Sequence, residues 1–210
     1  WNSFELTKES LESLQKTTYA NYDCIVVDNG SEDGSGNALK LYFPNIILIA
    51  SETNKGFTGG NNLGMDYALQ HGYEYIMMLN NDVAVESNFL EPLIARLDND
   101  PSVGAVQPLI YFHHDRNLIW NAGSRYLSWI GLPLTLMYFR KDPLRKQTMQ
   151  QKKIDWITGC AFMIRASVLR KTGTLKEPYF IYFEDVDLSF RIKQSGYQLG
   201  YVSESVIYHI

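Results

Sequence analysis

The sequence predicts an α/β fold in which a mostly parallel sheet is flanked by helices. Short apolar runs that are typical of strands alternate with amphipathic runs that are typical of helices. Polar residues gather directly after three of the strand-like runs, where parallel sheets bind ligands. The 210 residues, 45% of them hydrophobic, are enough for a single domain with a substantial core.

The first half of the chain carries the clearest alternation of elements. We expect a helix over 7–16 capped by Thr7, a strand over 24–28, a helix over 35–43 and a strand over 46–50. A loop rich in Gly and Asn, 54–64, should then lead into a helix that ends near Gly72. A strand over 75–82 and a helix starting at Ser87 follow.

The second half is less regular. Strands are expected over 103–112 and 160–165, a helix over 185–194, and two closing strands over 197–202 and 206–209. Residues 123–153 mix aromatic, proline and basic residues without periodicity, which indicates a loop-rich insertion. Its apolar stretch 129–139 is interpreted first as core, with contact to a membrane-bound acceptor or closure over a site as the alternatives.

Composition excludes several classes of partner. The net charge of −4 comes from 19 basic and 23 acidic residues mixed along the chain, so no polybasic tract indicates binding to nucleic acid or to an anionic membrane surface. No apolar stretch approaches the roughly 18–20 residues that cross a bilayer. Cys24 and Cys160 lie within apolar runs, which predicts buried thiols and a reducing compartment.

Three polar segments follow successive strands and predict one cleft. They are Asp28 with Asn29, the stretch 54–62, and residues 80–82. Each alone is an ordinary turn composition, but three in succession favour a shared ligand site at the carboxyl edge of the sheet. Glycines at 56, 59, 60 and 64 before a helix would allow close approach of a phosphate. Their spacing matches neither a dinucleotide fingerprint nor a Walker loop, which argues against a dehydrogenase and a P-loop ATPase.

Two acidic groups are candidates for chemistry. Asp82, beside Asn80 and Asn81, offers oxygen ligands to a hard cation such as Mg²⁺ or Mn²⁺. Glu184 and Asp185 begin an acidic run in which one carboxylate could remove a proton from an acceptor hydroxyl. The same run is also read as helix-start charge that complements the macrodipole.

Taken together, five motifs resemble the inverting family 2 glycosyltransferases, in particular their rhamnosyltransferase-like bacterial branch. In family order they are VVDNGSEDGS, GFTGGNNLG, LNNDV, WITGCAFMIR and FEDVDLSFR. The resemblance spans nearly the whole chain. It implies a Rossmann-like GT-A fold with a smaller acceptor-side β region, and inversion at the anomeric carbon. It also implies a dTDP- or UDP-linked sugar donor, a divalent metal, and a saccharide or lipid-linked acceptor in cell-surface polysaccharide synthesis.

Residue roles follow from the resemblance position by position. Asp28 matches the acid that binds the donor base, and Asn29 stands where many members have a second Asp. LNND takes the place of a D-x-D motif: Asp82 matches its metal-binding acid, Asn80 replaces its first acid, and His209 matches a histidine that ligates the metal in some members. Asp185 matches the catalytic base, with Glu184 as the alternative. The nucleotide-sugar site would further include Asn54, Gly56, Gly59, Gly60, Asn61 and Asn81, and the acceptor site Trp156, Thr158 and Gly159.

The resemblance also divides the chain. Residues 1–100 would form a nucleotide-binding half and 101–210 an acceptor-binding half of one catalytic domain, with the family's first strand and a C-terminal extension lying outside this sequence. A cytoplasmic location is expected, at the inner face of a membrane if the enzyme makes peripheral contact with it. Two alternatives stay open: a nucleotidyltransferase that makes nucleotide sugars, and a non-catalytic sugar-binding module that stacks aromatic residues on sugar rings.

Overall fold

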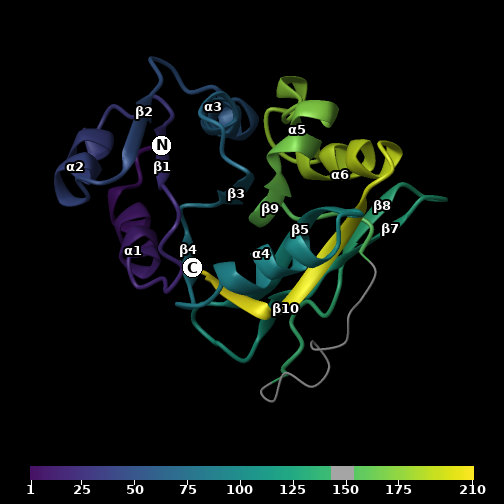
Figure 1. The fold of residues 1–210 in the computed structure, drawn as a ribbon. Helices are drawn as coiled ribbons and strands as arrows, with labels where there is room; N and C mark the ends of the chain where they lie inside the picture. Colours follow the sequence, from purple (N-terminus) through teal and green to yellow (C-terminus); the bar gives the residue numbers. More distant parts are fainter. Residues whose placement is uncertain (143–153) are drawn as a thin grey trace.

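The structure, a computed structural model, describes residues 1–142 and 154–210 (Figure 1). The predicted order of elements is largely confirmed, with shifts of a few residues at their ends. The helices are α1 (Phe4–Leu14), α2 (Ser35–Tyr42), α3 (Gly56–Gln70), α4 (Leu90–Asn99), α5 (Ala166–Thr172), η1 (Glu177–Tyr179) and α6 (Glu184–Gln194). The strands are β1 (Ile25–Asp28), β2 (Ile47–Ala50), β3 (Tyr75–Leu79), β4 (Val83–Val85), β5 (Val103–Phe112), β6 (Ile119–Asn121), β7 (Ser124–Leu127), β8 (Leu132–Thr135), β9 (Ala161–Arg165) and β10 (Gln198–His209).

The strand pairing is mixed, which corrects the expectation of a mostly parallel sheet. The central sheet has the order β3-β9-β5-β10-β4, with β6 paired to β5, and only β5 and β10 are parallel in it. β1 and β2 form a separate parallel pair, and β7 and β8 an antiparallel hairpin. Alternating strands and helices do not determine pairing here, because β9 comes from the second half of the chain and inserts antiparallel between β3 and β5.

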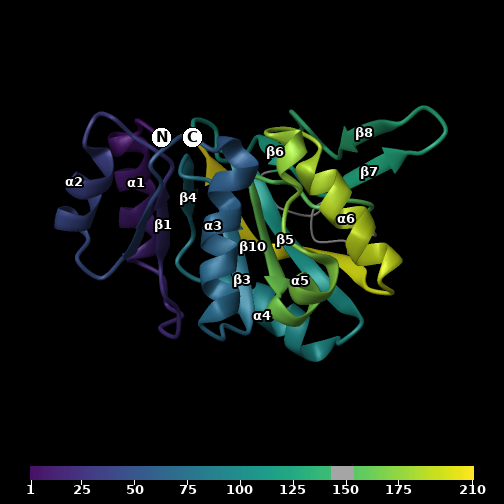
Figure 2. The same cartoon turned by 90° about the horizontal axis from the view of Figure 1, so that it is seen from above.

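Helices cover both faces of the central sheet (Figures 1 and 2). Successive side chains of a strand point to opposite faces. On β9, Phe162 and Ile164 join the core cluster that includes residues of α3, α5 and α6, whereas Ala161 and Met163 join the cluster built on α4. The core is therefore two apolar layers separated by one sheet. Within the described part of the chain, no helix is both long and apolar enough to cross a membrane.

The stretch rich in Gly and Asn is helical rather than a loop, which corrects the expectation for 54–64. α3 begins at Gly56 and includes three further glycines, although each interior glycine costs about 0.5–1 kcal/mol relative to Ala. Close packing accounts for two of them. A Cβ on Gly60 would lie 2.9 Å from Asn29 Nδ2, and a Cβ on Gly64 would lie 3.3 Å from Val27 Cγ2. Tertiary contact with β1 and its loop therefore outweighs the low helix propensity.

The expected loop-rich insertion contains regular structure. The β7–β8 hairpin lies within it, and the last part of the insertion, 143–153, falls outside the described residues. The interpretation of 129–139 as core is wrong, because most of its large apolar side chains are exposed. The two closing strands are one strand, β10, whose register with β5 shifts between Val202 and Val206.

Candidate active site

A cavity of about 1070 Å³ runs along β1 and β3, and one end of it lies where these two strands end. Most of the predicted nucleotide-site residues line it: Asp28, Asn29, Asn54, Gly56, Gly60, Asn61, Asn80 and Asn81. Gly59 does not; it is buried within α3. The structure thus brings together polar groups from three segments that are separated in sequence.

Part of this cavity is not a polar cleft but an apolar slot between β1 and β3. Both strands line it, together with Leu11 of α1 and Met65 of α3. β1 pairs only with β2, and β3 only with β9, among the residues that the structure describes. The whole volume is therefore larger than the space that a donor would occupy.

Asn29 joins the loop after β1 to the start of α3. Its Nδ2 donates to Asn54 Oδ1 (3.1 Å) and to the Gly56 carbonyl (2.9 Å), and its Oδ1 accepts the Lys55 N–H (3.0 Å). Asp28 Oδ1 accepts the Ser31 N–H at 3.0 Å. The loop after β1 and the amino end of α3 thus form one polar wall of the cavity.

The residues after β3 contact the amino end of the chain and β9. The amide nitrogen of Asn81 donates to Ser3 Oγ (3.1 Å) and Thr7 Oγ1 (3.0 Å). The Asn80 N–H donates to the Cys160 carbonyl at 3.0 Å. Asn61, by contrast, donates to the Phe57 carbonyl within its own helix.

Asp82 and His209 lie together, as the resemblance implies for a metal site. Asp82 Oδ2 is 3.7 Å from His209 Nε2, and Asp82 Oδ1 is buried and has no hydrogen-bond partner. The His209 ring stacks on Trp120 with centroids 4.8 Å apart. No group of three or more His, Cys, Asp or Glu side chains suited to a metal occurs among residues 1–142 and 154–210. Two ligands nevertheless fit a cation that takes its other ligands from water and phosphate, as Mg²⁺ commonly does.

Glu184 and Asp185 begin α6 and face Gly159. The Gly159 N–H donates to Asp185 Oδ2 at 2.7 Å, and the Val186 N–H donates to Asp185 Oδ1 at 2.7 Å. A Cβ on Gly159 would lie 3.2 Å from Glu184 Oε1, so the small residue leaves space for both carboxylates. Glu184 is buried, and its Oε2 has no hydrogen-bond partner. Both acids thus retain capacity to accept a proton, and the choice between them stays a prediction.

The environment makes both carboxyl groups weaker acids. Burial raises the pKa of Asp185, and the N–H groups of Gly159 and Val186 lower it only in part. Burial also raises the pKa of Glu184, and the neighbouring negative charge of Asp185 raises it further. A raised carboxyl pKa is what general-base catalysis near neutral pH requires.

Gly159 and Cys160 separate the two acidic sites. The Gly159 N–H donates to the Asp185 carboxylate. The Cys160 carbonyl accepts the N–H of Asn80, and Asn80 is two residues before Asp82. Burial raises the pKa of the Cys160 thiol, and the charge of Asp82 adds to that effect. The candidate metal ligand and the candidate base therefore flank the amino end of β9. Both cysteines are free; Cys160 is buried as predicted, whereas Cys24 is only partly buried.

The remaining predicted acceptor residues are buried. Trp156 donates its Nε1–H to the Arg125 carbonyl at 3.0 Å. The Thr158 N–H donates to Gln107 Oε1 (3.2 Å), and Thr158 Oγ1 accepts the Cys160 N–H (3.3 Å). Their contacts position the segment that holds Asp185, and direct contact with an acceptor stays a prediction.

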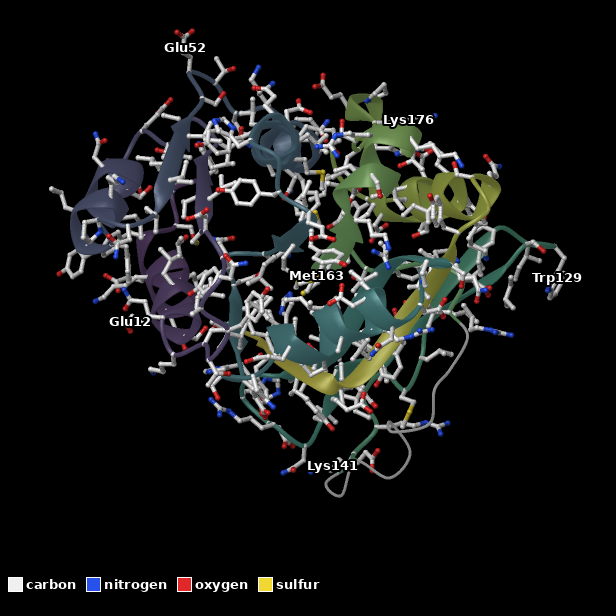
Figure 3. All side chains as sticks on the ribbon, in the orientation of Figure 1. Glu12, Glu52, Trp129, Lys141, Met163 and Lys176 are labelled. Carbon is white, nitrogen blue, oxygen red and sulfur yellow. The ribbon has the colours of Figure 1, made fainter. Side chains whose placement is uncertain are left out.

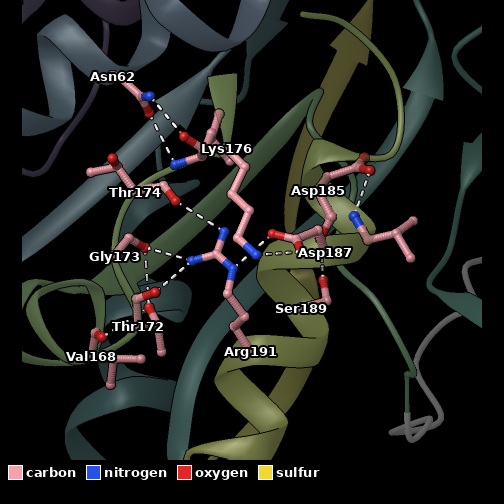
Figure 4. A network of polar contacts seen from close by, with 12 residues as sticks. Asn62, Val168, Thr172, Gly173, Thr174, Lys176, Asp185, Asp187, Ser189 and Arg191 are labelled. Atoms are coloured by element: carbon pink, nitrogen blue, oxygen red, sulfur yellow. Dashed lines mark hydrogen bonds and ion pairs between the residues drawn. The ribbon is translucent and has the colours of Figure 1, made fainter. Parts of the chain in front are cut away.

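A polar network behind α6 fixes the loop before η1 (Figure 4). Asp187 Oδ2 accepts from Arg191 Nε at 2.7 Å, and the Arg191 guanidinium donates to the carbonyls of Thr172, Gly173 and Thr174. Asn62 exchanges two hydrogen bonds with the backbone of Leu175, at 2.8 and 3.0 Å. The sequence pattern gives no indication of the long-range hydrogen bonds made by Arg191 and Asn62.

The aromatic segment before α6 was not predicted as part of the site. Phe180 lines the cavity, and its carbonyl accepts both the Thr58 N–H (3.1 Å) and the Thr58 hydroxyl (3.2 Å). Phe180, Tyr182 and Phe183 have positive φ, a strained conformation for non-glycine residues. The run YFIYF directly before the acidic pair was the available signal. It links α3 to α6.

Sequence comparison finds glycosyltransferases that are similar to this chain. The N-acetylglucosaminyl-diphospho-decaprenol L-rhamnosyltransferase of Mycobacterium tuberculosis is 26% identical over 218 residues, which cover 95% of this chain and 70% of the relative. The O-antigen chain rhamnosyltransferase WbaN of Salmonella anatum is 27% identical, and the match covers 96% of this chain and 60% of the relative. The low-salt glycan biosynthesis hexosyltransferase Agl10 of Haloferax volcanii is 24% identical, with 92% and 61% covered.

Solved structures support the fold. GalNAc-T7, crystallised with UDP, GalNAc and Mn²⁺, superposes with a TM-score of 0.74 at 20% identity, over 96% of this chain and 40% of that one. The mannosyltransferase PcManGT of Pyrobaculum calidifontis, in complex with GDP-Man and Mn²⁺, gives a TM-score of 0.68 at 17% identity, over 99% and 54%. The predicted GT-A fold is thereby confirmed. A family model described as Glycosyl transferase family 2 matches residues 1–173, and the chain therefore belongs to glycosyl transferase family 2.

Proposed function

We propose that this domain transfers a sugar from a nucleotide-diphosphate donor to a saccharide or lipid-linked acceptor, with inversion at the anomeric carbon. One observation carries the proposal: the amino end of β9 separates a buried carboxylate pair, Glu184 and Asp185, from the carboxylate and imidazole of Asp82 and His209. An inverting transfer needs a proton acceptor on one side of the reacting carbon and charge stabilisation on the other. The polar end of the cavity, where Asp28, Asn29 and Asn80 lie, would hold the nucleotide.

Asp185 is proposed as the base. As the acceptor oxygen attacks the anomeric carbon, the hydroxyl proton passes to the Asp185 carboxylate. The bond between that carbon and the diphosphate oxygen breaks on the opposite face, and the electron pair leaves with the nucleoside diphosphate. The Gly159 N–H at 2.7 Å keeps the carboxylate oriented during this step. Glu184 is the alternative base.

Asp82 and His209 would hold a divalent cation, Mn²⁺ or Mg²⁺. A bound cation would act as a Lewis acid that stabilises the negative charge of the departing diphosphate. The structural neighbours crystallised with Mn²⁺ support this assignment, as does the buried and unpartnered Asp82 Oδ1. The nucleotide would be bound by Asp28, Asn29 and the amino end of α3.

The curated relatives favour particular substrates. Two of them are named rhamnosyltransferases, and one of these is named for a lipid-diphosphate acceptor. We therefore propose dTDP-rhamnose as the first donor to test, with UDP-linked hexoses next, in the synthesis of a cell-surface polysaccharide. Two free cysteines support a reducing compartment, and a lipid-linked acceptor would place the enzyme at the cytoplasmic face of its membrane.

Product analysis with a panel of nucleotide sugars, with and without acceptor, tests the proposal. Release of a nucleoside diphosphate together with a glycosylated acceptor is the expected result. Release of inorganic diphosphate from a nucleoside triphosphate and a sugar phosphate would identify a nucleotidyltransferase. Ligand binding without any turnover, in protein that retains its cooperative unfolding transition, would leave a sugar-binding module. A thermal-shift screen with Mn²⁺ identifies the donor, because a ligand of the folded state raises Tm.

A further inference from the structure

An arm of exposed apolar residues projects from the acceptor half. We define the aromatic arm as the β7–β8 hairpin and the residues after it, 124–139. Trp129 at the turn is 81% exposed, Ile130 51% and Leu132 45%. Figure 2 shows the hairpin extending beyond α6, and Figure 3 shows Trp129 pointing away from the body of the molecule. Single exposed apolar residues are ordinary, but a group of them on a projecting element marks an interaction surface.

The charge pattern of the arm favours a bilayer surface over a protein partner. Residues 126–139 contain no charged side chain. Arg125, Arg140 and Lys141 flank them and are exposed; Arg125 lies 3.6 Å from Asp155, and Lys141 lies 3.4 Å from Asp115. Tryptophan and other apolar side chains bounded by basic residues are the composition that settles into the headgroup region of anionic membranes. The centre of a protein–protein interface is also poor in charge, so the flanking basic residues are the feature that favours an anionic bilayer.

The base of the arm is joined to the segment that holds the proposed catalytic base. The Asp155 N–H donates to the Ser124 carbonyl at 2.8 Å, and Trp156 Nε1–H donates to the Arg125 carbonyl at 3.0 Å. The Tyr126 ring contacts the Phe190 ring of α6 edge-on, with centroids 5.0 Å apart. A surface bound by the arm would therefore lie in a fixed relation to α6 and to Asp185.

We infer that the aromatic arm docks the domain on the surface of an anionic bilayer and so brings the acceptor side to a lipid-linked acceptor. The inference deepens the proposed function and rests on it for the identity of the acceptor. Membrane binding itself requires no catalysis, so the two proposals can fail separately.

Sedimentation with vesicles of phosphatidylethanolamine and phosphatidylglycerol in equal parts tests the inference. The variant Trp129→Ser/Ile130→Ser/Leu132→Ser should bind these vesicles at least about tenfold more weakly than the parent chain, which is the loss expected when one large apolar side chain no longer leaves water. The matched control is Leu41→Ser/Tyr42→Ser on α2, whose side chains are 83% and 62% exposed but lie in the other half. The control should bind as the parent does.

A second measurement reports whether Trp129 enters the bilayer, independently of the binding affinity. Brominated lipids should quench tryptophan fluorescence in the parent chain, and Trp129→Phe should bind vesicles but lose most of that quenching. Equal vesicle binding by the triple variant and the parent would overturn the inference. A concentration-dependent dimer that the triple variant abolishes would overturn it as well, since a second copy would then be the occupant. Turnover of a water-soluble acceptor should be unchanged in the triple variant, and its loss would contradict a role limited to docking.

Discussion

Asp185→Asn removes the proposed base and keeps the size of the side chain. Both carboxylate oxygens accept an N–H at 2.7 Å, from Gly159 and Val186. An amide has one oxygen, so Asn can keep one of these bonds and must turn an NH₂ group toward the other donor. We expect kcat to fall by about 10²–10⁴, the usual contribution of a general base. The dissociation constant of the donor should change little, because Asp185 does not line the nucleotide cavity.

The effect on stability must be separated from the effect on catalysis. Leaving one buried N–H without an acceptor costs about 1–3 kcal/mol, and loss of a buried charge offsets part of that cost. Since roughly 2–4 °C in Tm corresponds to 1 kcal/mol for a chain of this size, Tm should fall by less than about 10 °C. Asp187→Asn is the matched control on the same helix. It removes the charge of the carboxylate that lies 2.7 Å from Arg191 Nε but leaves the base, so folded protein should keep most of its turnover.

The pH profile adds a second readout. Because burial holds the pKa of Asp185 above 3.8, the acid limb of kcat/KM should lie above that value and should vanish in Asp185→Asn. Stability should change with pH in the opposite direction to kcat/KM. A raised folded-state pKa contributes stability that is complete below the unfolded pKa and is lost as pH rises through the folded one. The parent chain should therefore lose free energy of unfolding relative to Asp185→Asn over that interval. Near-normal turnover in Asp185→Asn, with loss in Glu184→Gln, would exchange the two assignments.

Three further predictions address the donor site, the cation and the loop before η1. Gly36→Ala should displace the Asp28 carboxylate, because the added Cβ would lie 2.1 Å from Asp28 Oδ2. The Kd of nucleoside diphosphates, measured by calorimetry, should then rise about tenfold. An unchanged Kd would remove Asp28 from the site. Removal of divalent metal by a chelator should abolish sugar transfer, and added Mn²⁺ should restore it. In Asp82→Asn/His209→Asn, Mn²⁺ should no longer increase the affinity for the nucleotide. Full transfer activity in metal-free buffer would contradict the assignment of Asp82 and His209 as metal ligands. Asn62→Ala should lower the free energy of unfolding by about 2–4 kcal/mol in denaturant titrations, because it leaves two buried backbone groups unpaired, and a loss under 1 kcal/mol would refute that account.

Local patterns predicted the elements and most of the cavity. Apolar runs located β1, β3, β5 and β9 within a few residues, and the polar residues after β1 and β3 line one cavity as expected from their place at strand ends. The resemblance brought Asp82 and His209 together from 127 positions apart, and the structure places them 3.7 Å from each other. The roles of these residues stay predictions.

Long-range strand pairing and hydrogen bonding could not be predicted from local sequence patterns. Nothing local shows that β9 inserts between β3 and β5, or that Asn62 pairs with the backbone 113 residues later. The glycines of α3 predicted a loop because glycine has a low helix propensity. Tertiary packing against Asn29 and Val27 outweighs that propensity in the folded protein. The stretch 129–139 read as core because apolar residues are usually buried, whereas on this hairpin they face solvent.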